Sequence, residues 1–512
     1  MKNTVGRGAF ILIVSGIVCK FFGALFRLPL TNIIGLQGIG LFQMVMSLYS
    51  LTLVFVSGGV TNAMSKLVST ARARGDVKAI GGYYRYALLF SLGIGFAFGL
   101  FFIIFSSAIS SLQGAAEASP SYMMLAALLP LGGLIGVFRG IIQGFENMTP
   151  TAVSQVLEQV GRFVFGLIFA YLFAKNGEGA GVFGAFLGIT VAEAIALAYL
   201  TVLMQRRVKL KPQRAPVRSA FFHAVVPLTL SGTVAPLTVA VESLIIVSLL
   251  TRAGMTVQTA TTLYGLQSGV VGAILHFPLV ISVSVAVALL PKISYLSATR
   301  DTAAQQRVVR NAFNIMWFLL IPLVMGIIAI ARVLYPIIYP SVINEYLAVA
   351  EQLTLLGGIS IVLSALMQLL NALLLAKGYF SYSLVFNLTS GFFKITTLLI
   401  FAPLSSVNIY AIPISNIVMY SIVCICALLK LGRLVRFKLF NFALPFMSAL
   451  IMAMVVRLWL SYLGGIWGIV TAVLLGAAVY FSFCLPLVYE YVAKFWQKIR
   501  PPTETDDQSE QS

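Results

Sequence analysis

The sequence predicts an all-α protein that crosses a membrane about 14 times, and its composition, hydrophobic segments and charge distribution support this. Hydrophobic residues make up 60% of the 512 residues, and charged residues only 10%. A chain this apolar is excluded from the class of soluble domains. Hydrophobic stretches of about 20 residues, the length that spans a bilayer, recur along it. The stretch 259–290 is longer and must bend or protrude.

Positive charge predicts the orientation. If the N-terminus is cytoplasmic, 26 of the 34 Lys and Arg residues fall on the cytoplasmic side, 3 on the outer side and 5 within spans. This asymmetry follows the positive-inside rule, so we expect both termini in the cytoplasm. The net charge of +19 is then a topology signal and does not indicate nucleic-acid binding.

A long basic linker divides the chain into two halves of six spans each, and two further spans follow. Ser65 and Asp76 follow the second span much as Ser294 and Asp301 follow the eighth. Six spans return the chain to its starting side, so such a repeat is parallel, with its axis along the membrane normal. Chance similarity between apolar sequences is the alternative. The expected units are an N-terminal lobe (1–208), a basic cytoplasmic linker (209–224), a C-terminal lobe (225–435), two further spans (436–493) and a disordered cytoplasmic tail (494–512).

The first hydrophobic segment, 8–30, carries two basic residues. Gly16, Lys20, Gly23 and Arg27 fall on one stripe of a helix. Lys20 lies roughly 18 Å along that helix, near the middle of the bilayer, where a cation costs at least about 2.5 kcal/mol. We expect the stripe to line a polar cavity that receives an anion. The alternatives are an ion pair with another helix, or an Arg27 that reaches the outer interface.

The fifth expected span carries Gln155, Glu158, Gln159 and Arg162 on one face. Glu193 on the sixth span lies at a similar depth, so Arg162 has two candidate acidic partners. Both a structural clamp and a substrate contact fit this intramembrane polar network.

In the second half, Glu242 and Lys394 lie at similar depths on different spans and could pair. This pair is a candidate coupling site that responds to a proton or cation, and a static ion pair is the alternative. His276 is expected to be a hydrogen-bonded contact within the helices, and a proton relay is the alternative.

The sequence shows no catalytic constellation. His223 and His276 are its only histidines, and its four cysteines lie in hydrophobic segments. We find no acidic pair, no nucleophile with a base and no metal-ligand spacing. We therefore expect neither an enzyme nor a cofactor or metal site.

Several motifs occur in an order that resembles a known family. They are Ala63 to Val68 with Arg74-Gly75-Asp76, Gln143-Gly144 to Pro150 followed by residues 154–162, Leu263-Tyr264-Gly265, Leu290-Pro291 and Asn371. This order resembles the multidrug/oligosaccharidyl-lipid/polysaccharide exporter superfamily, in its stage V sporulation protein B and polysaccharide transporter branch, which neighbours the MurJ-type lipid II flippases. The resemblance implies two six-helix lobes around a central cavity that alternates between inward and outward states.

The resemblance also implies a function. MurJ-type proteins place arginines of the first helix against the substrate diphosphate; Lys20 falls on one such position, Arg27 is shifted slightly, and Ala273 stands where they carry a further arginine. Related flippases can bind a cation in the C-terminal lobe, where we expect Lys394 to replace it.

The expected function is a flippase that moves an undecaprenyl-pyrophosphate-linked saccharide, lipid II-like or a polysaccharide repeat unit, across a bacterial plasma membrane. The expected partners are this substrate, the bilayer and cell-wall or polysaccharide synthesis enzymes, for a monomeric protein. A cation-coupled drug or metabolite antiporter and a non-transporting partner of a cell-wall synthase are the alternatives.

Overall fold

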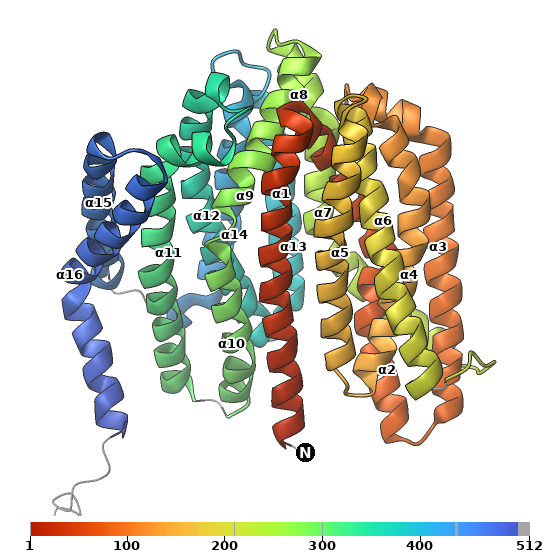
Figure 1. Ribbon diagram of the computed structural model, residues 1–512. Coiled ribbons are helices and arrows are strands. Elements are labelled where there is room, and N and C mark those ends of the chain that lie inside the picture. Colours follow the sequence, from red (N-terminus) through yellow and green to blue (C-terminus); the bar gives the residue numbers. More distant parts are fainter. Residues whose placement is uncertain (1, 209, 300, 436–438, 500–512) are drawn as a thin grey trace, which may run out of the picture.

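The computed structural model describes residues 2–208, 210–299, 301–435 and 439–499, which form helices and no strand (Figure 1). This confirms the all-α prediction. The first half contains α1 (Lys2–Leu53), α2 (Gly59–Ala73), α3 (Val77–Leu112), α4 (Ser119–Gly144), α5 (Thr149–Ala174) and α6 (Glu178–Leu203). The second half contains α7 (Arg218–Arg252), α8 (Val257–Gly265), α9 (Gly272–Leu275), α10 (Leu279–Ala298), α11 (Thr302–Ile338), α12 (Leu347–Ala376), α13 (Phe380–Phe401) and α14 (Ala411–Leu431), followed by α15 (Leu439–Tyr462) and α16 (Gly465–Ile499).

Thirteen segments of the described chain are long and apolar enough to cross a membrane. The first, Val14–Ala73, is 60 residues long. A single crossing needs about 20 residues, so this segment is long enough for two. Gly35 divides it, with a φ of 75° and a ψ of 177° that break the helix. Side chains with a Cβ rarely adopt such a φ, so glycine is the residue suited to this break.

Three boundaries differ from the sequence-based prediction. The chain is helical through most of residues 31–40, because the first two spans are joined by the break at Gly35 and not by a loop. Helix α7 begins at Arg218, inside the stretch predicted as a linker. Helix α16 continues to Ile499, and the rest of the predicted tail lies outside the described residues.

The two halves of the chain form two helical groups with α1 between them (Figure 1). Helices α2 to α6 pack together on one side, α10 to α14 on the other, and α15 and α16 pack against α11. The aspartates of the predicted repeat have the same role. Asp76 begins α3 by accepting a hydrogen bond of 2.8 Å from the N–H of Ala79, and Asp301 begins α11 with the same bond from Ala304. Both caps satisfy a free N–H group at a helix start.

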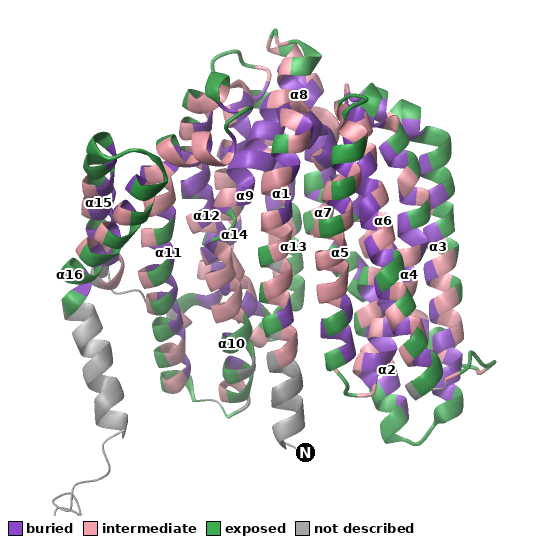
Figure 2. Cartoon of the chain, viewed as in Figure 1, coloured by how far each residue is buried: buried purple, intermediate pink, exposed green. Residues whose placement is uncertain are grey.

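The two halves of the chain touch closely where α1 meets α8, near the face opposite the N-terminus (Figure 1). A Cβ on Gly40 would lie 2.4 Å from the carbonyl oxygen of Thr261, and one on Gly265 would lie 2.0 Å from that of Leu36. Only glycine allows two helices to approach this closely. Buried residues gather around this junction, while the peripheral helices expose much of their surface (Figure 2). The junction is therefore closed in this conformation.

Candidate functional site

The α1 stripe is described in part. Lys20 lies on α1, but its side chain is outside the described part of the structure. Gly16 has open space around its Cα, and a Cβ on Gly23 would lie 3.8 Å from Oε1 of Gln159 on α5. The stripe therefore lies next to the polar face of α5 at Gly23 and borders open space at Gly16.

Arg27 lies deep between the two helical groups. Its side chain is nevertheless half-buried and not fully enclosed. Its electrostatic neighbours are Tyr264, Tyr339 and Arg162, which include no carboxylate. Within the described residues, Arg27 makes neither a salt bridge nor a side-chain hydrogen bond. An unpaired, partly accessible cation in the middle of the molecule is suited to attract an anion.

The polar face of α5 forms an ion network, as the sequence spacing indicated. Glu158 binds Arg139 at 3.0 Å and Arg162 at 3.2 Å through separate carboxylate oxygens. Arg162 also lies 3.7 Å from Glu193 of α6, so the structure contains both of its candidate partners. The hydroxyl of Tyr49 donates a hydrogen bond to Glu193. The network therefore links α1, α4, α5 and α6.

Arg139 is the charged member of this network that sequence reasoning missed, because it was counted with the basic residues outside the membrane, and Tyr49 was not predicted either. It lies on α4 with a side chain only 14% exposed, and its Nε donates to Ser154 at 2.9 Å. Its position one turn before the end of an expected span suggested an interfacial residue. A carboxylate has two oxygens that accept hydrogen bonds, and Arg162 accounts for only one oxygen of Glu158. A second cation beside Glu158 could therefore have been expected from the sequence.

The remaining polar residues of α5 face α1. Gln155 accepts a hydrogen bond of 3.3 Å from Ser15, and Gln159 lies beside Gly23. Cys19 lies near enough to Glu158, Arg139 and Arg162 to interact with them electrostatically. The network thus lies directly beside the α1 stripe.

The structure brings Glu242 of α7 and Lys394 of α13 together. Their charged atoms are 2.5 Å apart, and the side chains are 9% and 6% exposed. Both charges are therefore almost fully removed from solvent, and each depends on the other for compensation. The pair is separate from the network around Glu158.

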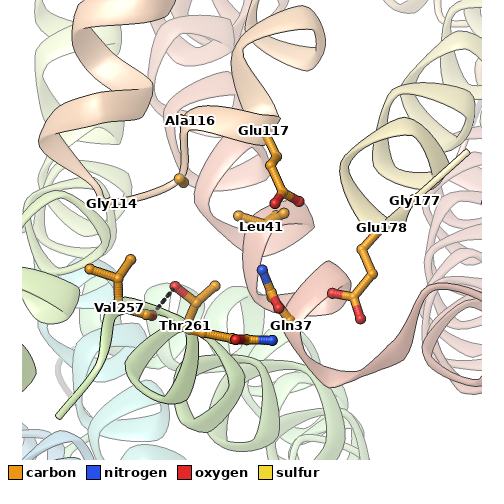
Figure 3. A pocket seen from close by; sticks show the side chains of 11 residues that line it. Gln37, Leu41, Gly114, Ala116, Glu117, Gly177, Glu178, Val257 and Thr261 are labelled. Atoms are coloured by element: carbon orange, nitrogen blue, oxygen red, sulfur yellow. Dashed lines mark hydrogen bonds between the residues drawn. The ribbon is translucent and has the colours of Figure 1, made fainter.

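A cavity of about 550 Å³ opens near the face opposite the N-terminus. Gln37 and Leu41 of α1, Glu117, Glu178 and Thr261 line it (Figure 3). It lies beside the closed α1–α8 junction. The described residues contain no cluster of three or more side chains able to hold a metal ion.

Near the N-terminal face, Lys377 follows α12 and donates a hydrogen bond to Gln305 of α11, which in turn donates to the carbonyl oxygen of Leu296 on α10. Partial burial lowers the pKa of Lys377. This chain of bonds ties three helices of the second half together.

Comparison with known proteins connects this arrangement to a family. Residues 5–297 match the family model described as polysaccharide biosynthesis protein. Stage V sporulation protein B of Bacillus subtilis is 29% identical over 304 residues, which cover 57% of this chain and 58% of that protein. Lipid II flippase MurJ of the same organism is 25% identical over 374 residues, 67% of each chain. The chain thus spans only part of the curated relatives it matches.

Solved structures show the same fold. The inward closed conformation of lipid II flippase MurJ aligns with a TM-score of 0.73 and 15% identity, over 94% of this chain and all of that one. An inward-facing MATE family transporter of the MOP superfamily aligns with a TM-score of 0.63 and 14% identity, over 81% of this chain and 95% of that one. The predicted exporter fold is thereby confirmed, and the chain belongs to the polysaccharide biosynthesis protein family.

Proposed function

We propose that this protein is a flippase that moves an undecaprenyl-pyrophosphate-linked saccharide from the inner to the outer leaflet of a bacterial plasma membrane, with both termini in the cytoplasm. Arg27 is the observation that carries this proposal. It is an unpaired, partly accessible cation deep between the two helical groups. An anionic headgroup would compensate a charge that no carboxylate of the described chain compensates.

The charge balance of the neighbouring network supports this assignment. Glu158 and Glu193 balance Arg139 and Arg162, so that network needs no external anion. The charge left for a substrate is that of Arg27, and the proposal adds that of Lys20, two positions away on the stripe with Gly23 between them. In the proposed cycle these cations neutralise the pyrophosphate, the sugar passes through the polar interior, and the lipid tail remains in the bilayer.

The relatives' names favour a lipid-linked substrate. One similar protein is named a lipid II flippase, and this chain shares its fold. The proposed partners are the lipid-linked saccharide and enzymes of cell-wall or polysaccharide synthesis.

The test is a lipid II translocation assay in cells depleted of their own flippase. We expect the wild-type protein to restore translocation, and Arg27→Gln and Lys20→Ala to abolish it at near-normal protein levels. Arg332→Gln is the matched control, because its side chain is 81% exposed, and it should retain activity. Wild-type protein that is present at normal levels without translocating lipid II would reject lipid II as the substrate. Full activity of Arg27→Gln would reject the role of this cation.

A further inference from the structure

The helix that follows α8 breaks in the middle of the molecule. Helix α9 ends at Leu275, and α10 begins at Leu279. Between them, His276 and Phe277 are exposed, Phe277 by 53%. Helix α9, whose C-terminal end His276 follows, packs against α1, α11 and α12. The exposed side chain of His276 thus follows a helix surrounded by others, and Arg27 of the neighbouring α1 is only partly covered.

Arg27 and His276 lie close enough to interact electrostatically. Helix α1, which carries Arg27, packs against α9 (Figure 1). Of the other groups near Arg27, Tyr264 and Tyr339 are neutral phenols. The nearest acidic group on α7, Glu242, is paired with Lys394, and Glu351 of α12 is paired with Arg332.

These contacts leave Arg27 and His276 as two basic side chains without a carboxylate partner among the described residues, while the third cation near Arg27, Arg162, is balanced by Glu158 and Glu193. The region between them is electropositive and accepts an anion more readily than a cation.

The ring of His276 has a fixed orientation. Its Nδ1 lies 2.5 Å from the carbonyl oxygen of Gly272. A carbonyl oxygen can only accept, so Nδ1 carries the hydrogen and donates it. In the neutral ring, Nε2 therefore has a bare lone pair, which would repel an anion. When Nε2 is protonated it becomes a charged donor, the kind of group that binds phosphate oxygens strongly.

We propose that Arg27 and His276 together form the site for a pyrophosphate group, and that His276 takes up one proton at Nε2 when the anion binds. This inference rests on the proposed function and adds a residue and a proton to it. The proton comes from water and returns to it when the anion leaves, and no covalent bond to the substrate forms. Binding then becomes weaker as the pH rises, by up to about tenfold per pH unit where free His276 is neutral.

The chain offers a direct readout, since it contains only two histidines. His223 is the matched control: it is exposed on α7, and its Nδ1 makes the same kind of bond, 2.8 Å long, to the carbonyl oxygen of Ser219 four residues earlier. Full-length protein with 13C-labelled histidine rings gives two ring signals by NMR, which His223→Gln and His276→Gln assign. The probes are inorganic pyrophosphate and farnesyl pyrophosphate.

We expect either probe to move the His276 signal toward its protonated position near neutral pH and to leave the His223 signal in place. If only farnesyl pyrophosphate acts, the site requires the lipid as well as the diphosphate. His276→Gln should weaken binding at low pH roughly tenfold and leave only the pH dependence that comes from the titration of the probe's own phosphates, while His276→Lys should bind at high pH as well as at low pH. Arg27→Gln should weaken binding at every pH without removing the pH dependence.

An unchanged His276 signal at saturating probe, an unchanged pH dependence in His276→Gln, or no binding of either probe would overturn the inference. Lipid II translocation reports on the proposed function separately. Translocation without a response of His276 rejects only this inference, and a response of His276 without translocation rejects only lipid II as the substrate.

Discussion

Glu158 and Glu193 contact the guanidinium groups of Arg139 and Arg162, but Glu158 has more of these contacts than Glu193. Glu158 has a cation on each oxygen, Arg139 and Arg162. Glu193 is only 2% exposed, and its Oε1 contacts Tyr49 and, at 3.7 Å, Arg162, while its Oε2 has no hydrogen-bond partner in the described structure. Glu193 therefore depends on Arg162 more than Glu158 does. This geometry favours a structural clamp for Arg162.

Removing Arg162 should destabilise the protein through Glu193. Arg162→Ala leaves a buried carboxylate without a cation, and we expect a loss on the order of 3 kcal/mol of folding free energy, together with lower abundance. Glu193→Gln in the same chain should recover part of that loss, because the amide carries no charge. Glu158→Gln should recover less, since Arg139 still compensates Glu158.

Thermal unfolding of the four proteins of the Arg162/Glu193 double-mutant cycle measures this coupling, which we expect to lie at roughly 1–3 kcal/mol. Arg332→Ala is the control, because it removes an exposed ion pair and should change stability little. Strictly additive effects of Arg162→Ala and Glu193→Gln would contradict the clamp.

Helix α1 contributes to three of the features described above. It carries the cation stripe, borders the α5 network and closes against α8 through Gly40 and Gly265. The break at Gly35 lies a short distance before this junction. A helix broken beside a tight contact that two glycines allow can separate from its partner without disturbing the part that carries Arg27. The α1–α8 junction is therefore suited to open and close.

A larger side chain in place of a junction glycine should prevent this closed conformation. Gly40→Val places a Cβ within van der Waals conflict of the Thr261 backbone, which cannot move aside as a side chain can. We expect Gly40→Val to abolish translocation and to raise the labelling of a cysteine introduced at Gln37, on the adjoining cavity, by a membrane-impermeant maleimide.

Gly93→Val is the matched control, since a Cβ on Gly93 meets no atom within 4 Å. A parallel sample without the introduced cysteine gives the background of the native thiols. Normal translocation and unchanged labelling in Gly40→Val would show that the junction does not need to close this tightly.

For the molecule as a whole, the sequence was sufficient to predict the properties that depend on composition and on the spacing of residues. Apolar length predicted the helical membrane fold, and i,i+4 spacing predicted the contact of Glu158 with Arg162. The burial and contacts of single side chains, which depend on how the helices pack, were harder to predict. Arg139 lies near the end of an expected span, and this position alone did not show that its side chain is buried among helices. The exposure of His276 depends on where the helix after α8 breaks and on how its neighbours pack, which the sequence does not show.

The pairing of Glu242 with Lys394 leads to a prediction about what drives the whole transport cycle. The ammonium of Lys394 lies against the carboxylate of Glu242 in a nearly solvent-free setting, and so supplies the positive charge that a bound cation would otherwise supply to this carboxylate. We expect wild-type transport to proceed equally when Na⁺ is replaced by K⁺. Lys394→Met leaves a buried carboxylate uncompensated, so its transport should require Na⁺ or be lost.

Translocation of a labelled lipid-linked saccharide in proteoliposomes, with Na⁺ or K⁺ as the salt, measures this dependence. Lys394→Met combined with Glu242→Gln is the control: it carries neither charge, binds no cation there, and should show no preference for Na⁺. Transport that is strictly sodium-dependent in the wild type and in Lys394→Met alike would contradict the prediction. Glu242 and Lys394 would then be a static ion pair that holds α7 to α13, and the coupling ion would bind elsewhere in the molecule.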